Sequence, residues 1–149
     1  MTLKEIEGKD AMAKILVVDD EVTLCALYAE ELSEEGYEVV STSDCRWLME
    51  MIEQSGPDLI LLDIRMGQYD GLDLLQNIRN VYYNMPVILL SAYSSFKYDL
   101  KSIAADSYVV KSADLTELKK KINMALEARV SSLTEKRIAR MERQASAHP

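Results

Sequence analysis

The sequence of 149 residues has few cysteines and no long apolar run. Cys25 and Cys45 stand 20 residues apart, without a CxxC motif or a Cys/His cluster beside them. This pattern argues against a zinc site or a disulfide framework, so we expect both thiols to be small core or surface residues. A membrane-spanning helix needs about 20 consecutive apolar residues, and the sequence contains no such run.

The first ten residues are polar and acidic and lack the apolar stretch of a signal peptide. We therefore expect a cytoplasmic protein that does not associate with a membrane. A chain of this length is ordinary for one domain. We interpret residues 1–12 as a polar leader, 13–129 as the domain, and 130–149 as a basic helical extension or tail.

Positive charge is scarce in most of the chain, whose net charge is −8. Residues 1–128 contain 12 Lys and Arg against 23 Asp and Glu, whereas residues 129–149 contain 5 against 2. An acidic domain is a poor nucleic-acid binder, because affinity for DNA depends largely on neutralising phosphates. We expect no direct DNA binding. The basic tail is most simply a solvated helical extension, with contact to an acidic partner as the alternative.

Short apolar runs alternate with helical stretches along the chain. The predicted strands are residues 15–18, 37–41, 59–62, 87–90 and 108–110. Apolar residues at helical spacing predict helices over about 22–35, 44–55, 72–78, 96–104 and 115–126. Gly36 and Gly56 are placed to end the first two helices. Ser43 or Asp44 can cap the second helix, and the last can be capped by Asp114 or Thr116.

Strands that are apolar throughout and separated by helices indicate a parallel sheet covered on both faces, with right-handed crossovers. The sequence therefore predicts an α/β domain with a doubly wound, five-stranded parallel sheet. Helical spacing continues through Val130, Leu133, Ile138 and Met141. The last helix can thus extend beyond the domain as a projecting stalk.

Polar residues follow the predicted strands. Asp19 and Asp20 follow the first strand, Asp63 the third, Ser91 the fourth and Lys111 the fifth. In an open parallel sheet the carboxyl ends of the strands share one crevice, so we expect these side chains to meet. Neighbouring carboxylates raise one another's pKa unless a cation lies between them, and a hard divalent ion such as Mg²⁺ suits carboxylate and carbonyl ligands.

Such a site has the parts to accept a phosphoryl group. It offers a carboxylate nucleophile, a metal ion and a lysine that neutralise charge, and a hydroxyl that donates a hydrogen bond. The alternative is that Asp20, Asp63 and Lys111 are unrelated charges at strand ends. Their joint placement after the first, third and fifth strands favours a shared site.

Together these motifs resemble the receiver domain of bacterial two-component response regulators. The resemblance covers about residues 13–129 and is carried by ILVVDDE, LILLDIRMGQYDGLDLL, VILLSAY and DSYVVKS. No single motif would decide it, but the ordered set is specific. The resemblance implies a flavodoxin-like (βα)5 fold with strand order 2-1-3-4-5. It also implies a switch in a phosphorelay of signal transduction.

The resemblance assigns a role to each site residue. Asp63 is the expected phosphorylated residue, and the expected Mg²⁺ ligands are Asp20, Asp19 beside it, Asp63 and the backbone carbonyl of Arg65. Mn²⁺ is expected to substitute for Mg²⁺. The residues expected to bind the phosphoryl group or to switch with it are Ser91, Ala92, Lys111 and Tyr108.

Two large residues flank the expected site. Arg65 and Tyr93 are placed to limit the access of water to an acyl phosphate, which predicts slow self-dephosphorylation. Receivers usually have Met-Pro and Lys-Pro where this chain has Met66-Gly67 and Lys111-Ser112. A cis peptide before a non-proline residue costs about 3–4 kcal/mol. Either the loop after Lys111 adopts a trans peptide or the fold bears this strain.

The implied partners are a histidine kinase or phosphotransfer protein and a downstream protein effector. A homodimer that depends on phosphorylation is left open, as is the choice between a stand-alone receiver and one excised from a longer regulator. We expect no enzyme activity beyond the receiver's own phosphorylation and dephosphorylation. The alternatives are a pseudo-receiver that binds partners without phosphorylation and an aspartyl-phosphate phosphatase. A flavodoxin-like or dinucleotide binder is disfavoured, because no GxGxxG motif or phosphate loop follows the first strand.

Overall fold

The computed structural model describes residues 13–92 and 105–146. Its centre is a sheet of five parallel strands in the order β2-β1-β3-β6-β7. These strands are β1 (Lys14–Val18), β2 (Glu38–Thr42), β3 (Leu59–Asp63), β6 (Val87–Ser91) and β7 (Ser107–Val110). They correspond to the five predicted strands, so the doubly wound sheet with order 2-1-3-4-5 is confirmed.

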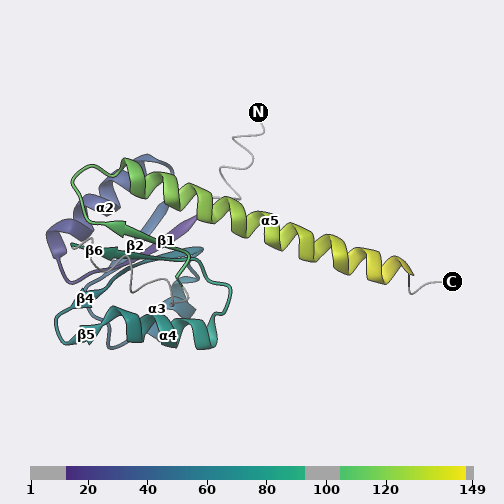
Figure 1. Ribbon diagram of the computed structural model, residues 1–149, viewed down its shortest axis with the longest axis horizontal. Coiled ribbons are helices and arrows are strands. Elements are labelled where there is room, and N and C mark those ends of the chain that lie inside the picture. The colour runs from purple at the N-terminus through teal and green to yellow at the C-terminus, as the bar shows by residue number, and fades with distance from the viewer. Residues whose placement is uncertain (1–12, 93–104, 147–149) are drawn as a thin grey trace.

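Helices cover both faces of the sheet (Figure 1). The helices are α2 (Val22–Glu34), α3 (Leu48–Ser55), α4 (Gly71–Val81) and α5 (Thr116–Ser146). α2 and α5 share one hydrophobic core with the sheet, and α3 and α4 share the other. The helix predicted over residues 96–104 lies outside the described residues.

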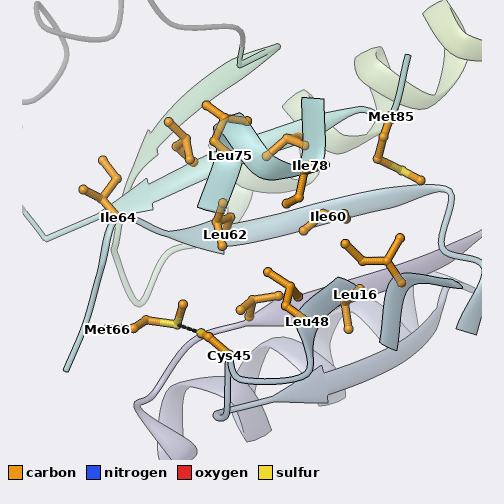
Figure 2. Packing of buried hydrophobic residues seen from close by; sticks show 14 residues of the cluster. Leu16, Cys45, Leu48, Ile60, Leu62, Ile64, Met66, Leu75, Ile78 and Met85 are labelled. Atoms are coloured by element: carbon orange, nitrogen blue, oxygen red, sulfur yellow. Dashed lines mark hydrogen bonds between the residues drawn. The ribbon is translucent and has the colours of Figure 1, made fainter. Parts of the chain in front are cut away.

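The two cores follow from alternation along each strand. In β1, Leu16 and Val18 belong to the core under α3 and α4, whereas Ile15 and Val17 belong to the core under α2 and α5. All four are fully buried, which explains why the strand is apolar at every position. Figure 2 shows the core under α3 and α4, where the Cys45 Sγ lies 3.6 Å from the sulfur of a buried methionine, Met66.

Local turn chemistry explains most helix ends. Gly36 follows α2 with a φ of +97°, and Gly56 ends α3 in the left-handed conformation, as predicted. The predicted cap of α3 is wrong. Its N-cap is Trp47, which makes no side-chain cap hydrogen bond, while Asp44 accepts a hydrogen bond from the backbone N–H of Arg46 and pairs with the Arg46 guanidinium before the helix begins.

The start of α5 agrees with the sequence. Asp114 accepts hydrogen bonds from the backbone N–H of Thr116 at 3.0 Å and from its hydroxyl at 2.6 Å. The helix then runs without a break to Ser146, which confirms the continuation predicted from the spacing of apolar residues. Within the described residues, no helix combines the length and apolar character needed to cross a membrane.

A small hairpin after β3 was not predicted. β4 (Arg65–Met66) pairs in antiparallel fashion with β5 (Tyr69–Asp70). Gly67 lies in the two-residue turn with a φ of +53°, a conformation that glycine adopts without steric cost. The loop expected after the third strand is therefore a tight hairpin that leads directly into α4.

Candidate functional site

The carboxyl ends of the strands bring the predicted residues to one edge of the sheet. Asp19 and Asp20 follow β1, whereas Asp63 and Ser91 are the last residues of β3 and β6. Lys111 directly follows β7, and its backbone N–H donates to the Ser91 carbonyl at 2.7 Å. Parallel pairing sets Asp63 opposite Leu90 and Ser91 opposite Val110, and thus brings Asp63, Ser91 and Lys111 to the same edge of the sheet.

Lys111 lies at the centre of the charged cluster. Its Nζ is 2.8 Å from Asp19 Oδ2, 3.0 Å from Asp63 Oδ2 and 3.2 Å from Glu21 Oε1. Only about a tenth of the lysine side chain is exposed. These carboxylates raise the pKa of Lys111 against the opposing effect of burial, so the ammonium stays charged at neutral pH.

Three carboxylates form a group that could hold a metal ion. Asp19, Asp20 and Asp63 each offer an oxygen, and these oxygens lie within 4.8 Å of one another. Asp19 is fully buried and Asp63 is 4% exposed, whereas Asp20 is exposed. The cluster therefore has a buried floor and an open side.

One buried oxygen of this group lacks a well-directed hydrogen bond. Asp19 Oδ1 accepts from the backbone N–H of Glu21 at 2.9 Å. Asp19 Oδ2, in contrast, accepts no hydrogen bond within the described part of the chain and contacts Lys111 only as an ion pair. Asp19, Asp63 and Glu21 contact one ammonium, and Asp20 adds a fourth carboxylate beside Asp19 and Asp63. The donor set fits Mg²⁺, which prefers carboxylate oxygens and keeps several waters.

Burial makes the Asp63 carboxyl group a weaker acid than usual. The pKa of Asp63 is raised from 3.8 to about 6, mainly by desolvation and to a lesser degree by the nearby Asp19 charge. Hydrogen bonds from Lys111 and from the Arg65 backbone N–H, at 3.2 Å, oppose this rise. The carboxylate is thus mostly ionised at neutral pH, yet its charge lowers the stability of the fold unless a further cation is bound.

This cost gives a testable pH dependence. Because the pKa of Asp63 is higher in the folded than in the unfolded chain, its ionisation destabilises the fold as pH rises from about 4 through about 6. Without a divalent metal, we expect Asp63→Asn to raise the free energy of unfolding by about 1–3 kcal/mol at pH 7.5. The gain should disappear at pH 4. Urea unfolding of both proteins with EDTA at both pH values measures this gain. If Asp63→Asn and the wild-type chain are equally stable at pH 7.5, the raised pKa of Asp63 is contradicted.

The other residues predicted for the site differ in how exposed they are. Ser91 is buried, Ala92 is exposed and Tyr108 is half-buried on β7. Tyr93 lies outside the described residues. Arg65 is exposed on the hairpin, two residues after Asp63. The roles of these residues in phosphoryl binding, switching and water access stay predictions.

Sequence reasoning missed two contributors to the site. Glu21 was treated only as the end of the acidic run, yet it pairs with Lys111, and its place beside two aspartates was the available signal. Gly71 precedes the helix predicted over about 72–78, yet it opens α4, and its N–H donates to the Ile64 carbonyl at 2.7 Å. A Cβ there would lie 2.2 Å from the Asp63 carbonyl oxygen, so glycine is required.

The peptide between Lys111 and Ser112 is trans, since the described residues contain no cis peptide bond. Of the two conformations left open by the sequence, the chain adopts the relaxed one. Lys111 still reaches Asp63 at 3.0 Å in this conformation. The ammonium is therefore in place without the proline that receivers usually have.

Comparison with known proteins identifies the fold and the family. The family model of the response regulator receiver domain matches residues 15–123. The chain belongs to this family. This receiver domain is 31% identical over 119 residues to the regulatory protein AtoC of Escherichia coli, covering 78% of this chain and 26% of AtoC. It is 35% identical to the probable transcriptional regulator ycf27 of Guillardia theta, covering 82% and 47%.

Solved receivers agree with the fold. The response regulator TrrA from Thermotoga maritima, crystallised with Mg²⁺ and beryllofluoride, matches with a TM-score of 0.72 and 42% identity, covering 76% of this chain and 99% of TrrA. NtrX from Brucella abortus matches with a TM-score of 0.78 and 29% identity, covering 85% and 29%. The receiver domain thus spans about a quarter to a half of the length of the curated relatives it matches.

Proposed function

We propose that this receiver domain is a phosphoacceptor switch in which Asp63 takes a phosphoryl group from a histidine kinase or phosphotransfer protein. The observation that carries the proposal is the contact of Lys111 with Asp63 and Asp19 beside an exposed Asp20. One nucleophilic carboxylate is held next to a fixed ammonium and two further carboxylates. The likeness to TrrA, which was crystallised with Mg²⁺ and beryllofluoride, supports the same chemistry.

The transfer is a displacement at phosphorus. An oxygen of the Asp63 carboxylate forms a bond to phosphorus while the bond from phosphorus to the donor imidazole nitrogen breaks, and the imidazole leaves with that electron pair. Lys111 would balance the negative charge on the phosphoryl oxygens, and the Ser91 hydroxyl would donate a hydrogen bond to one of them. Bound Mg²⁺, held by Asp19, Asp20, Asp63 and the Arg65 carbonyl, would neutralise charge on the same oxygens.

Phosphorylation would then change the affinity for a protein effector. In the proposed switch the Ser91 hydroxyl turns toward the phosphoryl group and Tyr108 moves into the space that this opens. Tyr108 packs at the margin of the core under α3 and α4, so its movement would alter the neighbouring surface. Catalysis by the chain is confined to its own phosphorylation and dephosphorylation, with Mn²⁺ able to replace Mg²⁺.

Beryllofluoride tests this proposal without a kinase. Beryllofluoride mimics a phosphoryl group on an aspartate, so with Mg²⁺ it should raise the unfolding temperature of the wild-type chain by several degrees, because a ligand that binds the folded state stabilises it. Asp63→Ala should abolish the shift. The matched control is Glu53→Ala, which removes an exposed carboxylate of α3 outside the charged cluster and should keep the shift. A wild-type chain that shows no shift would favour a pseudo-receiver.

A further inference from the structure

α5 extends beyond the domain on which its first turns pack. Its 31 residues span about 46 Å, yet its buried residues, Leu118 and Ile122, lie in the first two turns. Arg129 makes a late contact with the domain, donating to the Asp58 carbonyl at 2.6 Å. We call residues 130–146 the stalk, and Figure 1 shows it projecting away from the sheet.

The stalk exposes large apolar side chains on one side. Val130, Leu133, Ile138 and Met141 are each 50–63% exposed. At 100° per residue, these four positions lie within an arc of about 140° around the helix. The row Leu118, Ile122 and Leu126 that packs on the domain is centred about 90° away around the helix, so the stripe is largely a separate surface. An apolar stripe in water on an otherwise polar helix indicates a surface that a partner covers.

The four positions are arranged symmetrically along the stalk. Val130 and Met141 are equally far from the point midway between residues 135 and 136, and so are Leu133 and Ile138. A second, antiparallel copy related by a two-fold axis at this point would place Val130 opposite Met141 and Leu133 opposite Ile138. The stripe is therefore complementary to itself in the antiparallel orientation.

A charged residue inside the stripe distinguishes an antiparallel pair of stalks from a parallel one. Arg137 and Thr134 fall within the same arc as the apolar side chains. In a parallel pair in register, Arg137 would face Arg137 of the second copy, and like charges directly opposite destabilise a helix pair. In the antiparallel pair Arg137 faces Thr134 instead, whose hydroxyl can accept a hydrogen bond.

The distribution of charge favours the same orientation. Residues 1–128 have 23 acids against 12 bases, whereas residues 129–149 have 2 acids against 5 bases. A parallel pair would set two acidic domains side by side. An antiparallel pair separates the domains and brings the basic end of each stalk, with Arg140 and Arg143, toward the acidic domain of the other copy.

We propose that two copies of the chain associate through their stalks as an antiparallel helix pair centred between residues 135 and 136. Four apolar side chains per copy make a smaller contact than the roughly 800 Å² per partner of a standard interface. The pair is therefore weak and depends on concentration. It does not depend on phosphorylation of Asp63, so its test and that of the proposed switch are independent.

Cysteine cross-linking tests the orientation. The variants Val130→Cys and Met141→Cys are oxidised separately and as an equal mixture, and the native cysteines are both buried. The antiparallel pair predicts a mixed disulfide in the mixture and little product from either variant alone. The reason is that equivalent residues lie 11 positions, about 16 Å, apart along the axis. Efficient cross-linking of each variant with itself, or none in the mixture, would overturn the proposal.

Sedimentation equilibrium over a concentration series tests the stripe itself. Leu133→Glu should weaken self-association by roughly tenfold or more, because it sets a charge in the apolar contact. Ser132→Glu is the matched control, since it adds the same charge on the opposite side of the helix and should leave association almost unchanged. The unfolding transition checks that each variant folds. A wild-type chain that remains monomeric into the millimolar range would also overturn the proposal.

Discussion

Gly71→Ala is expected to destabilise the receiver domain by about 3 kcal/mol or more, far beyond an ordinary glycine substitution. The added Cβ would lie 2.2 Å from the Asp63 carbonyl oxygen, 2.7 Å from Ile64 Cα and 2.9 Å from the Ile64 carbonyl oxygen. All three are backbone atoms, so no side chain can turn aside to make room. α4 must move away from the end of β3, which also carries the phosphoacceptor.

The matched control is Gly56→Ala. Gly56 has a φ of +58°, and a Cβ there would meet no atom within 4 Å. That substitution therefore tests backbone strain alone, which costs about 1 kcal/mol. Urea unfolding of both variants measures the difference. If Gly71→Ala costs no more than Gly56→Ala, the close approach of α4 to β3 is not as described.

Lys111→Met is expected to lower the free energy of unfolding by about 3 kcal/mol at pH 7.5 without a divalent metal. The substitution leaves Asp19 and Asp63 buried without the ammonium that contacts both of them. Without that charge the pKa of Asp63 in the folded chain should rise further, because the hydrogen bond and charge of Lys111 lower it in the wild-type chain. Part of the stability lost at pH 7.5 should therefore return as pH falls toward 4 and Asp63 becomes neutral.

Divalent metal should also restore part of this stability, because Mg²⁺ brings positive charge to the same carboxylates. Urea unfolding at pH 7.5 and pH 4, with EDTA or Mg²⁺, separates these effects. Lys119→Met is a suitable control, since Lys119 pairs with Glu31 and Glu35 on the surface between α5 and α2. An equal loss of stability for Lys111→Met at both pH values would contradict the electrostatic explanation.

The parallel, doubly wound sheet was predictable because two patterns were clear in the sequence, whereas the order of its strands was implied by the resemblance to receiver domains. Apolar runs bounded by charges marked doubly buried strands, and helical spacing marked the crossovers between them. Placing Asp63 and Lys111 at one edge then followed from the geometry of parallel strands. In the structure Lys111 Nζ lies 3.0 Å from Asp63 Oδ2.

Other features could not be read from the sequence because they depend on tertiary contacts. Gly71 looks like a loop residue until the backbone of Asp63 and Ile64 is in place beside it. α3 begins at Leu48 with Trp47 as its N-cap, whereas Asp44 accepts from the backbone N–H of Arg46 in the turn before the helix, a difference that cap preferences alone do not resolve. Repulsion between the acids predicted a metal ion. In the structure the Lys111 ammonium already offsets part of this repulsion, because it contacts Asp19.

The most direct test of the proposed switch is the mass of the intact chain after incubation with acetyl phosphate and Mg²⁺. The wild-type chain should gain the mass of one phosphoryl group, and EDTA should prevent the gain. Asp63→Asn should gain nothing, although its fold is expected to be at least as stable. A wild-type chain that gains no mass, or an adduct that persists in Asp63→Asn, would contradict the assignment of Asp63 as the phosphoacceptor.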